Sequence, residues 1–387
     1  MTRKPSILLS LSLALAVGLA ACSGQVAAAT WPGLATDGNF AYVAYNQQVH
    51  AINLSDGRQA WAFPSTPNNN TGLFYADPGV STDVLVVGSE GPPNSYSGVL
   101  YGLSPTTGQQ QWCLAFDQKG AQRTNCPAAD GPGTTGFLGI SVPTDNSLFG
   151  GITLTESVAY FGLASGRVYA VDAGTGAVKW TFDTQRSVYT APLVVEDTVY
   201  VPSLDKNVYA LNRADGTLLW QTPLGGAVAG TPALADGTLY VGSFDSRLHA
   251  LDAATGDEKW FAPANDWVWG GPVVTEGVVY FTDLSGAAFA VEAQSGEQIW
   301  SVTPGETIRG SPAVTGDTVY VSDRAGNLFA LDRATGSTRW SKTEKGQLLA
   351  TPLVAGDTVL ISIYNGDNLL VAYTPTGDLK WPFAPSN

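Results

Sequence analysis

Eight times along the chain, a glycine is followed four residues later by a tryptophan. The pairs are Gly57/Trp61, Gly108/Trp112, Gly176/Trp180, Gly216/Trp220, Gly256/Trp260, Gly296/Trp300, Gly336/Trp340 and Gly377/Trp381. From Trp180 to Trp340 the tryptophans recur at a constant interval, and the wider spacings before Trp180 indicate the same unit with insertions. A repeat of about 40 residues is typical of units that cannot bury their own hydrophobic face and must pack on their neighbours.

One repeat unit, residues 189–220, contains four short segments with strand-like sequences. Residues 190–195, 198–201 and 208–212 are rich in β-branched and aromatic residues, and the turn at Asp215-Gly216 leads into a segment that carries Trp220. Eight such units predict an all-β, eight-bladed propeller of four-stranded antiparallel blades over residues 31–387. The units run in phase from Trp31 to Trp381, so we expect the ring to close without an exchanged terminal strand. The weakest seam is then expected between the first and last blades.

Prolines near the start of each unit define the inner strand. Pro78 and Pro32 mark the second and first blades, and Gly151 takes this place in the third. The prolines of the later blades recur at the same interval as the tryptophans and are Pro192, Pro232, Pro272, Pro312 and Pro352.

Just before each inner strand lies a position that repeats in place but varies in residue type. Its occupants are Phe149, Tyr189, Ala229, Trp269, Arg309 and Leu349. In a propeller such residues surround the mouth of the central channel. The sequence therefore predicts a ligand- or partner-binding site at this mouth, formed by Arg186, Tyr189, Trp267, Trp269 and Arg309. Aromatic faces and fixed cations suit a planar anion. The alternative is that these side chains simply plug the channel.

Residues 1–21 are typical of a targeting segment. Arg3 and Lys4 precede an apolar run, residues 7–19, that is short for a membrane span. The run ends in Leu19-Ala20-Ala21-Cys22, which resembles the lipobox of bacterial lipoproteins, in which the cysteine is acylated. We therefore expect a signal peptide over residues 1–21, lipidation at Cys22, a linker over 22–30, and an extracytoplasmic protein anchored to a bacterial membrane, at the outer membrane or cell surface. An ordinary secretory signal is the alternative.

The two remaining cysteines, Cys113 and Cys126, lie near the ends of one insertion. An even pair in an oxidising compartment favours a disulfide, with two free thiols as the alternative. The formal net charge of −14 argues against nucleic acid as a partner, because like charges repel. Envelope or membrane proteins and the bilayer itself are the expected partners of a monomeric propeller.

No residue stands out as catalytic or as a metal ligand. Asp172, Asp252 and Asp332 recur four residues before the turn glycine, where a short polar side chain accepts turn N–H groups. His50 and His249 occupy a position held by tyrosine or phenylalanine in other blades, and we interpret both as packing residues.

Three units carry the string Ala-x-Asp-x-x-Thr-Gly-x-x-x-Trp, over residues 170–180, 250–260 and 330–340. This string resembles the tryptophan-docking motif of the pyrroloquinoline-quinone-type (PQQ-type) propeller repeat family. With the lipobox and this length, the chain is most similar to the propeller lipoproteins of the bacterial outer-membrane β-barrel assembly machine. That resemblance implies a noncatalytic scaffold without a cofactor. The alternatives are a PQQ-dependent dehydrogenase that uses PQQ with calcium, and a carbohydrate or small-ligand sensor that uses Trp267 and Trp269.

Overall fold

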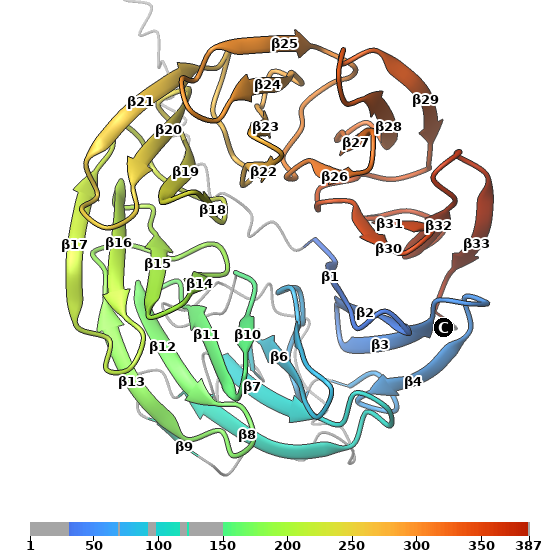
Figure 1. Cartoon of the computed structure of the whole chain (residues 1–387). Coiled ribbons are helices and arrows are strands. Elements are labelled where there is room, and N and C mark those ends of the chain that lie inside the picture. Colours follow the sequence, from blue (N-terminus) through green and yellow to red (C-terminus); the bar gives the residue numbers. More distant parts are fainter. Residues whose placement is uncertain (1–30, 69, 92–97, 117–121, 124–149, 386–387) are drawn as a thin grey trace, which may run out of the picture.

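The computed structural model describes residues 31–68, 70–91, 98–116, 122–123 and 150–385. Within these ranges the regular secondary structure is entirely β-strand, and the strands form eight antiparallel sheets arranged in a ring (Figure 1). Each sheet is one blade, and its strands are neighbours in the order in which they occur along the chain. The predicted all-β, eight-bladed propeller is confirmed.

The first four blades contain β1 to β17. Blade 1 consists of β1 (Gly33–Thr36), β2 (Phe40–Tyr45), β3 (Gln48–Asn53) and β4 (Gln59–Phe63). Blade 2 consists of β5 (Gly79–Val80), β6 (Leu85–Ser89), β7 (Gly98–Leu103), β8 (Gln110–Phe116) and β9 (Gln122–Arg123). Blade 3 consists of β10 (Thr153–Thr155), β11 (Val158–Gly162), β12 (Arg167–Asp172) and β13 (Val178–Asp183). Blade 4 consists of β14 (Leu193–Val195), β15 (Thr198–Pro202), β16 (Asn207–Asn212) and β17 (Leu218–Pro223).

The last four blades contain β18 to β33. Blade 5 consists of β18 (Ala233–Ala235), β19 (Thr238–Ser243), β20 (Arg247–Asp252) and β21 (Glu258–Pro263). Blade 6 consists of β22 (Val273–Thr275), β23 (Val278–Thr282), β24 (Ala288–Glu292) and β25 (Gln298–Val302). Blade 7 consists of β26 (Ala313–Thr315), β27 (Thr318–Ser322), β28 (Asn327–Asp332) and β29 (Thr338–Thr343). Blade 8 consists of β30 (Leu353–Ala355), β31 (Thr358–Ser362), β32 (Leu370–Tyr373) and β33 (Leu379–Phe383).

Blade 2 departs from the four-stranded plan. Its outer strand β8 is followed by the short strand β9, which pairs with β8 through Ala115↔Arg123 and Phe116↔Gln122. The four expected strands are present, and β9 is a fifth strand that part of the insertion after β8 adds to the outer edge of the sheet.

The glycine–tryptophan repeat holds neighbouring blades together. The indole Nε1 of Trp180 donates a hydrogen bond to the carbonyl oxygen of Arg213 in the next blade, at 2.9 Å. The turn glycine of that next blade, Gly216, lies against the same indole, and a Cβ built on it would come within 2.7 Å of the ring. Gly216 also has a φ of 74°, which favours glycine. The tryptophan of each blade therefore packs against the turn glycine of the next blade, where the absence of a side chain leaves room for the indole.

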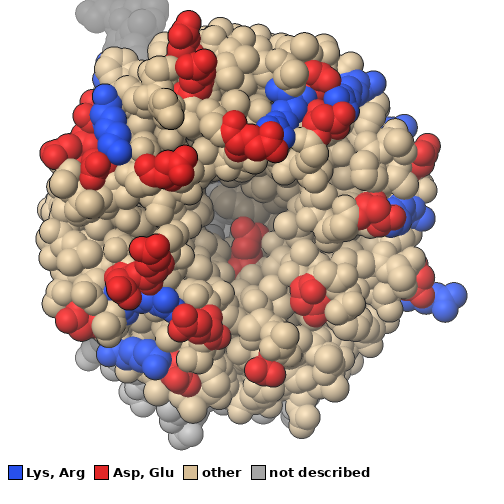
Figure 2. All heavy atoms as spheres, viewed as in Figure 1, with Lys and Arg blue, Asp and Glu red and all other residues tan. Residues whose placement is uncertain are grey.

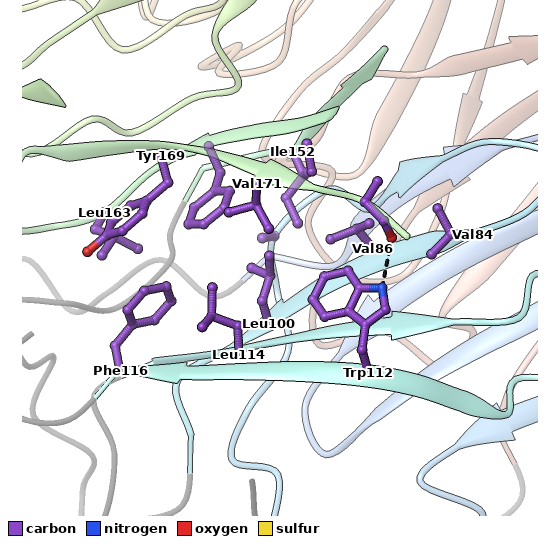
Figure 3. Close-up of a cluster of buried hydrophobic side chains, with 14 residues drawn as sticks. Val84, Val86, Leu100, Trp112, Leu114, Phe116, Ile152, Leu163, Tyr169 and Val171 are labelled. Atoms are coloured by element: carbon purple, nitrogen blue, oxygen red, sulfur yellow. Dashed lines mark hydrogen bonds between the residues drawn. The ribbon is translucent and has the colours of Figure 1, made fainter. Parts of the chain in front are cut away.

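The hydrophobic core lies between the blades. Figure 3 shows the cluster between blades 2 and 3, where Trp112, Leu114 and Phe116 of β8 face residues of blade 3 such as Tyr169. The dashed line in that figure is the hydrogen bond from Trp112 Nε1 to the Ala173 carbonyl oxygen, at 2.7 Å. Seven further clusters of this kind are found among the described residues.

The ring closes by side-chain and backbone contacts between blades 8 and 1. Trp381 Nε1 donates to the Leu54 carbonyl oxygen at 3.0 Å, and Ser362 Oγ donates to the Pro32 carbonyl oxygen at 3.0 Å. All four strands of blade 1 come from the amino-terminal side, and all four strands of blade 8 come from the carboxyl-terminal side. Closure without strand exchange is confirmed. That this seam is the weakest stays a prediction.

The inner-strand positions of blades 1 and 3 differ from those expected. In blade 4, Leu193 pairs with Tyr200, and in blade 1 the corresponding pair is Ala35 and Tyr42. Pro32 therefore corresponds to Thr190 rather than to Pro192, and Trp31 corresponds to Tyr189. In blade 3, Thr153 pairs with Tyr160, so Ile152 and not Gly151 takes the place of the proline. The β2–β3 connection is one residue shorter than its blade 4 counterpart, so the spacing between the inner strand and the tryptophan is also shorter in blade 1.

Several sequence predictions fall on residues outside the described ranges. These are the signal peptide, the lipidation site Cys22, the linker 22–30, and two members of predicted sets, Cys126 and Phe149. Cys113 lies in β8, and its pairing with Cys126 stays a prediction. Over the described part of the chain, no helix has the length and apolar character needed to cross a bilayer.

Candidate functional site at the channel mouth

A run of stacked side chains crosses the mouth of the central channel. Trp267 stacks on Phe244 with ring centroids 4.7 Å apart and an interplanar angle of 7°. Phe244 in turn lies 4.9 Å from Trp269, and the Arg309 guanidinium lies over the Trp269 ring at 4.1 Å. The same guanidinium lies 5.1 Å from the ring of Trp31. We call these five residues the mouth platform.

The platform is assembled from loops of four blades. Phe244 follows β19 in blade 5, Trp267 and Trp269 precede β22 in blade 6, Arg309 precedes β26 in blade 7, and Trp31 precedes β1 in blade 1. The strands of each blade hold the ends of its loop in place. The side chains of the platform therefore meet although none of them lies in a strand. Trp267 is 45% exposed, so one end of the platform presents a flat aromatic face to solvent.

Arg309 sits between two indoles, which is a strong cation–π arrangement. Its guanidinium forms no hydrogen bond or ion pair with a described residue, and burial lowers its pKa. The positive charge of Arg324 acts in the same direction, while Tyr189 raises the pKa. An arginine has five N–H donors, so this side chain can still bind an anionic or carbonyl group that approaches the platform.

Two predicted mouth residues behave differently from each other. Tyr189 lies beside the platform, where burial raises its hydroxyl pKa and the charge of Arg309 lowers it. Arg186 is exposed, and its carbonyl oxygen accepts hydrogen bonds from Thr184 Oγ1 and Ser203 Oγ at 2.6 and 3.2 Å. Its guanidinium forms no hydrogen bond or cation–π contact with a described platform residue. The structure thus brings Trp267, Trp269, Arg309 and Tyr189 together and leaves Arg186 outside.

Sequence reasoning missed Phe244 and Trp31. Phe244 occupies a loop position held by Leu204, Leu284 and Arg324 in neighbouring blades, and this variation at a fixed place is a signal that could have found it. Trp31 was missed because Pro32 was aligned with the wrong position of the repeat. Counting from the strand pairs of blade 1 would have placed it at the mouth.

The loop acids near this face bond within their own blades. Asp205 accepts the N–H groups of Gln185 and Asn207, and Asp283 accepts the N–H groups of Asn265 and Ser285. A calcium ion needs several oxygens that converge on one point. Among the residues that the structure describes, no group of three or more His, Cys, Asp or Glu side chains is placed to hold a metal ion. The loop acids therefore do not fit the calcium site that a PQQ cofactor would need.

Charge is distributed around the rim rather than concentrated at one patch. Figure 2 shows acidic and basic side chains spread around one face, with acidic atoms also visible inside the central hollow. Ion pairs such as Arg333 with Glu276 and Lys380 with Asp357 involve the turns after the first and third strands of a blade, at the opposite ends of the strands from the platform loops. Exposed ion pairs of this kind contribute little to stability. For ligand binding, the charges inside the hollow are therefore the ones to consider.

A protein-family comparison decides the identity of this propeller. A model described as outer membrane protein assembly factor BamB matches residues 23–130, 97–227, 204–289 and 284–386, which together span nearly the whole chain. The chain belongs to the BamB family. The family resemblance inferred from the tryptophan-docking motif is thus confirmed. A comparison with curated protein sequences finds no match to this BamB-family chain.

Solved structures show the same fold. The chain is similar to BamB from Moraxella catarrhalis, with a TM-score of 0.66 and 19% identity over 88% of this chain and 92% of that one. The computationally designed protein Ika8 gives a TM-score of 0.70 and 13% identity, over 89% of this BamB-family chain and 96% of that one. The quinohemoprotein alcohol dehydrogenase ADHIIG from Pseudomonas putida HK5 gives a TM-score of 0.65 and 14% identity, over 90% of this chain and 74% of that one. At these identities the likeness concerns the fold, which does not determine function.

Proposed function

We propose that this protein is a noncatalytic scaffold of the bacterial envelope that binds partner proteins during outer-membrane protein assembly. The family match over nearly the whole chain is the observation that carries the proposal. The solved structure of BamB, which aligns over most of both chains, supports it. In this proposal the propeller is lipid-anchored through Cys22, lies outside the cytoplasm and works as a monomer without a resident cofactor.

The mouth platform is the surface we assign to partner binding. Tryptophan and arginine are among the residue types that contribute most binding energy at protein interfaces. Trp267 offers an exposed aromatic face, and Arg309 is held in one orientation with its donors unused by described residues. Side chains that are already ordered lose little entropy on binding, which favours affinity.

A complementation experiment tests this role. In the source bacterium, deletion of the gene should lower the amounts of outer-membrane β-barrel proteins, measured by quantitative proteomics of the membrane fraction. The parent chain should restore them, and the Trp267→Ala variant should restore them poorly, because the exposed end of the platform is lost. Leu379→Ala is the matched control, since Leu379 is 58% exposed on the outer strand of blade 8, far from the mouth.

Two results would count against the proposal. If the deletion left barrel proteins unchanged, the assembly role would be wrong. If Trp267→Ala restored them as fully as Leu379→Ala, the role could stand but its assignment to the platform would be lost.

A PQQ-dependent dehydrogenase is the second candidate, because a quinohemoprotein alcohol dehydrogenase shares the fold. Titration of the purified protein with PQQ and calcium, followed by dye reduction with simple alcohols, separates the two. Saturable binding with turnover would favour the enzyme over the scaffold. The flat face of Trp267 also keeps a carbohydrate or small-ligand sensor as a third alternative, and a glycan array tests it.

A further inference from the structure

A small chamber lies on the propeller axis, beside the platform, and all eight blades contribute to its wall. Its volume is about 120 Å³, and the residues that matter most for its chemistry are Trp31, Asp77, Tyr189, Thr231, Trp269 and Thr351. One water molecule needs about 10 to 15 Å³ by this measure, so the chamber holds on the order of ten waters. A ligand of roughly five to ten non-hydrogen atoms would fill it.

Asp77 supplies a negative charge to this chamber. Its Oδ1 accepts the N–H of Leu34 at 2.8 Å, and its carbonyl oxygen accepts the N–H of Ile152 at 3.0 Å, so the residue is fixed between blades 1 and 3. Its side chain is exposed to the hollow, although the ring surrounds it, and its carboxylate forms no ion pair with a described residue. Asp77 is the acidic residue among the described ones that line the chamber. A surrounded charge without an opposite charge is costly, and a cationic group would offset that cost.

Arg309 does not line the chamber itself but holds a positive charge beside it. Its two indole neighbours, Trp31 and Trp269, both line the chamber. Neither Arg309 nor Asp77 is paired with the other or with another described charge. A simple amine would leave the arginine unmatched, and a simple anion would leave the carboxylate unmatched. A molecule that carries both charges would match the two together.

We propose that the axial chamber binds a small zwitterion of the α-amino acid class. Its ammonium group would pair with Asp77, its carboxylate with Arg309, and the hydroxyl groups of Thr231 and Thr351 would offer further hydrogen bonds. Because all eight blades line the chamber, a ligand bound there would also stabilise the closed ring. This proposal does not depend on the scaffold role.

Isothermal titration calorimetry of the purified mature protein with each of the twenty standard amino acids tests the site. At least one should bind saturably at about pH 7.5, where Asp77 is ionised. Methylamine and acetate each carry half of the charge pattern, so each should bind at least about tenfold more weakly than that amino acid. Absence of saturable binding by all twenty up to about 10 mM would overturn the proposal, as would equal binding of either half-ligand.

Asp77→Asn locates the site in the same assay. The change keeps the shape of the side chain and an oxygen for the Leu34 N–H, so the fold should survive. It should weaken amino-acid binding by about tenfold or more, which corresponds to the loss of one charged contact. Asp83→Asn is the matched control, because Asp83 is an exposed residue of the same blade. Unchanged affinity in Asp77→Asn would show that the binding site is elsewhere.

Discussion

Single residues at the axis show where this fold carries an unfavourable charge. Burial raises the pKa of Asp77 from its ordinary value of 3.8 to about 6, and the Leu34 N–H offsets only part of this shift. The folded chain therefore binds the proton more tightly than the unfolded chain. Ionisation destabilises the fold, and this effect grows as the pH rises from about 4 to about 6.

The first stability prediction follows from that sign. Asp77→Asn should raise the free energy of unfolding at pH 7 by about 1 kcal/mol, once screening by water in the chamber is allowed for. The gain should disappear below about pH 4, where the parent carboxyl is protonated in both states. Urea unfolding at the two pH values measures it, with Asp83→Asn, at an exposed position of the same blade, as the matched control. A gain of equal size at both pH values would contradict the charge argument.

The sequence predicted some of the site residues and missed others for identifiable reasons. Trp269 and Arg309 were found because they vary at a position that otherwise repeats in step with the tryptophans. Asp77 could not be found in this way, because loop lengths in blade 2 differ and acidic residues are common in turns. Its importance comes from its place on the axis, which depends on the closure of the whole ring.

At the scale of the blade, the turn between the third and fourth strands does two things. It reverses the chain at a glycine with positive φ, and it receives the indole of the preceding blade. Gly216 meets Trp180 in this way, whereas Gly237, in the turn between the first two strands of blade 5, has a φ of 67° and nothing within 4 Å of a built Cβ. A substitution at Gly237 therefore tests backbone strain alone, whereas one at Gly216 tests backbone strain together with the packing of the indole.

A pair of alanine substitutions tests this separation. Gly237→Ala should destabilise by about 1 kcal/mol through its left-handed backbone alone. Gly216→Ala should cost about 2 kcal/mol more, because the added methyl displaces the Trp180 ring and disturbs the hydrogen bond to Arg213. Thermal unfolding of both variants checks the difference. Equal losses would mean that the glycine is needed only for its backbone conformation.

The sequence was also most informative about blades where the repeat is regular. The strands of blades 4 to 7 recur along the chain at the period of the tryptophans. Blade 2 was predicted less well because the period is lost after Trp112, so its fifth strand, β9, carried no repeat signal. A periodic sequence predicts strands that occupy equivalent positions in every blade. An edge strand that comes from an insertion has no equivalent in other blades, so the period cannot predict it.

For the whole molecule, ring closure depends on one seam without a peptide connection between its two blades. Blades 1 and 8 share a cluster that includes Leu34, Leu360 and Trp381. Every other pair of neighbouring blades is also joined by the chain itself. Opening at this seam therefore needs no unfolding of a connecting segment, and we expect it to open first.

Hydrogen exchange under mild urea tests this expectation. Trp381→Ala and Trp300→Ala remove indoles that are 6% and 7% exposed, and each should cost about 3 to 5 kcal/mol. The first variant should lose amide protection in blades 1 and 8 before the rest of the ring. The second should lose protection around blades 6 and 7 without separating them as readily. If both variants lost protection evenly around the ring, the seam would not be a weak point.

Trp31 lies at the channel mouth, so the chain enters the propeller at its hub rather than at its rim. With Cys22 lipidated, as the sequence predicts, nine residue steps separate the anchor from Trp31, and fully extended they span at most about 32 Å. Such a short central tether would turn the mouth platform toward the bilayer and leave the opposite face looking into the aqueous compartment. Proteins embedded in that membrane would then reach the platform more readily than proteins that diffuse freely.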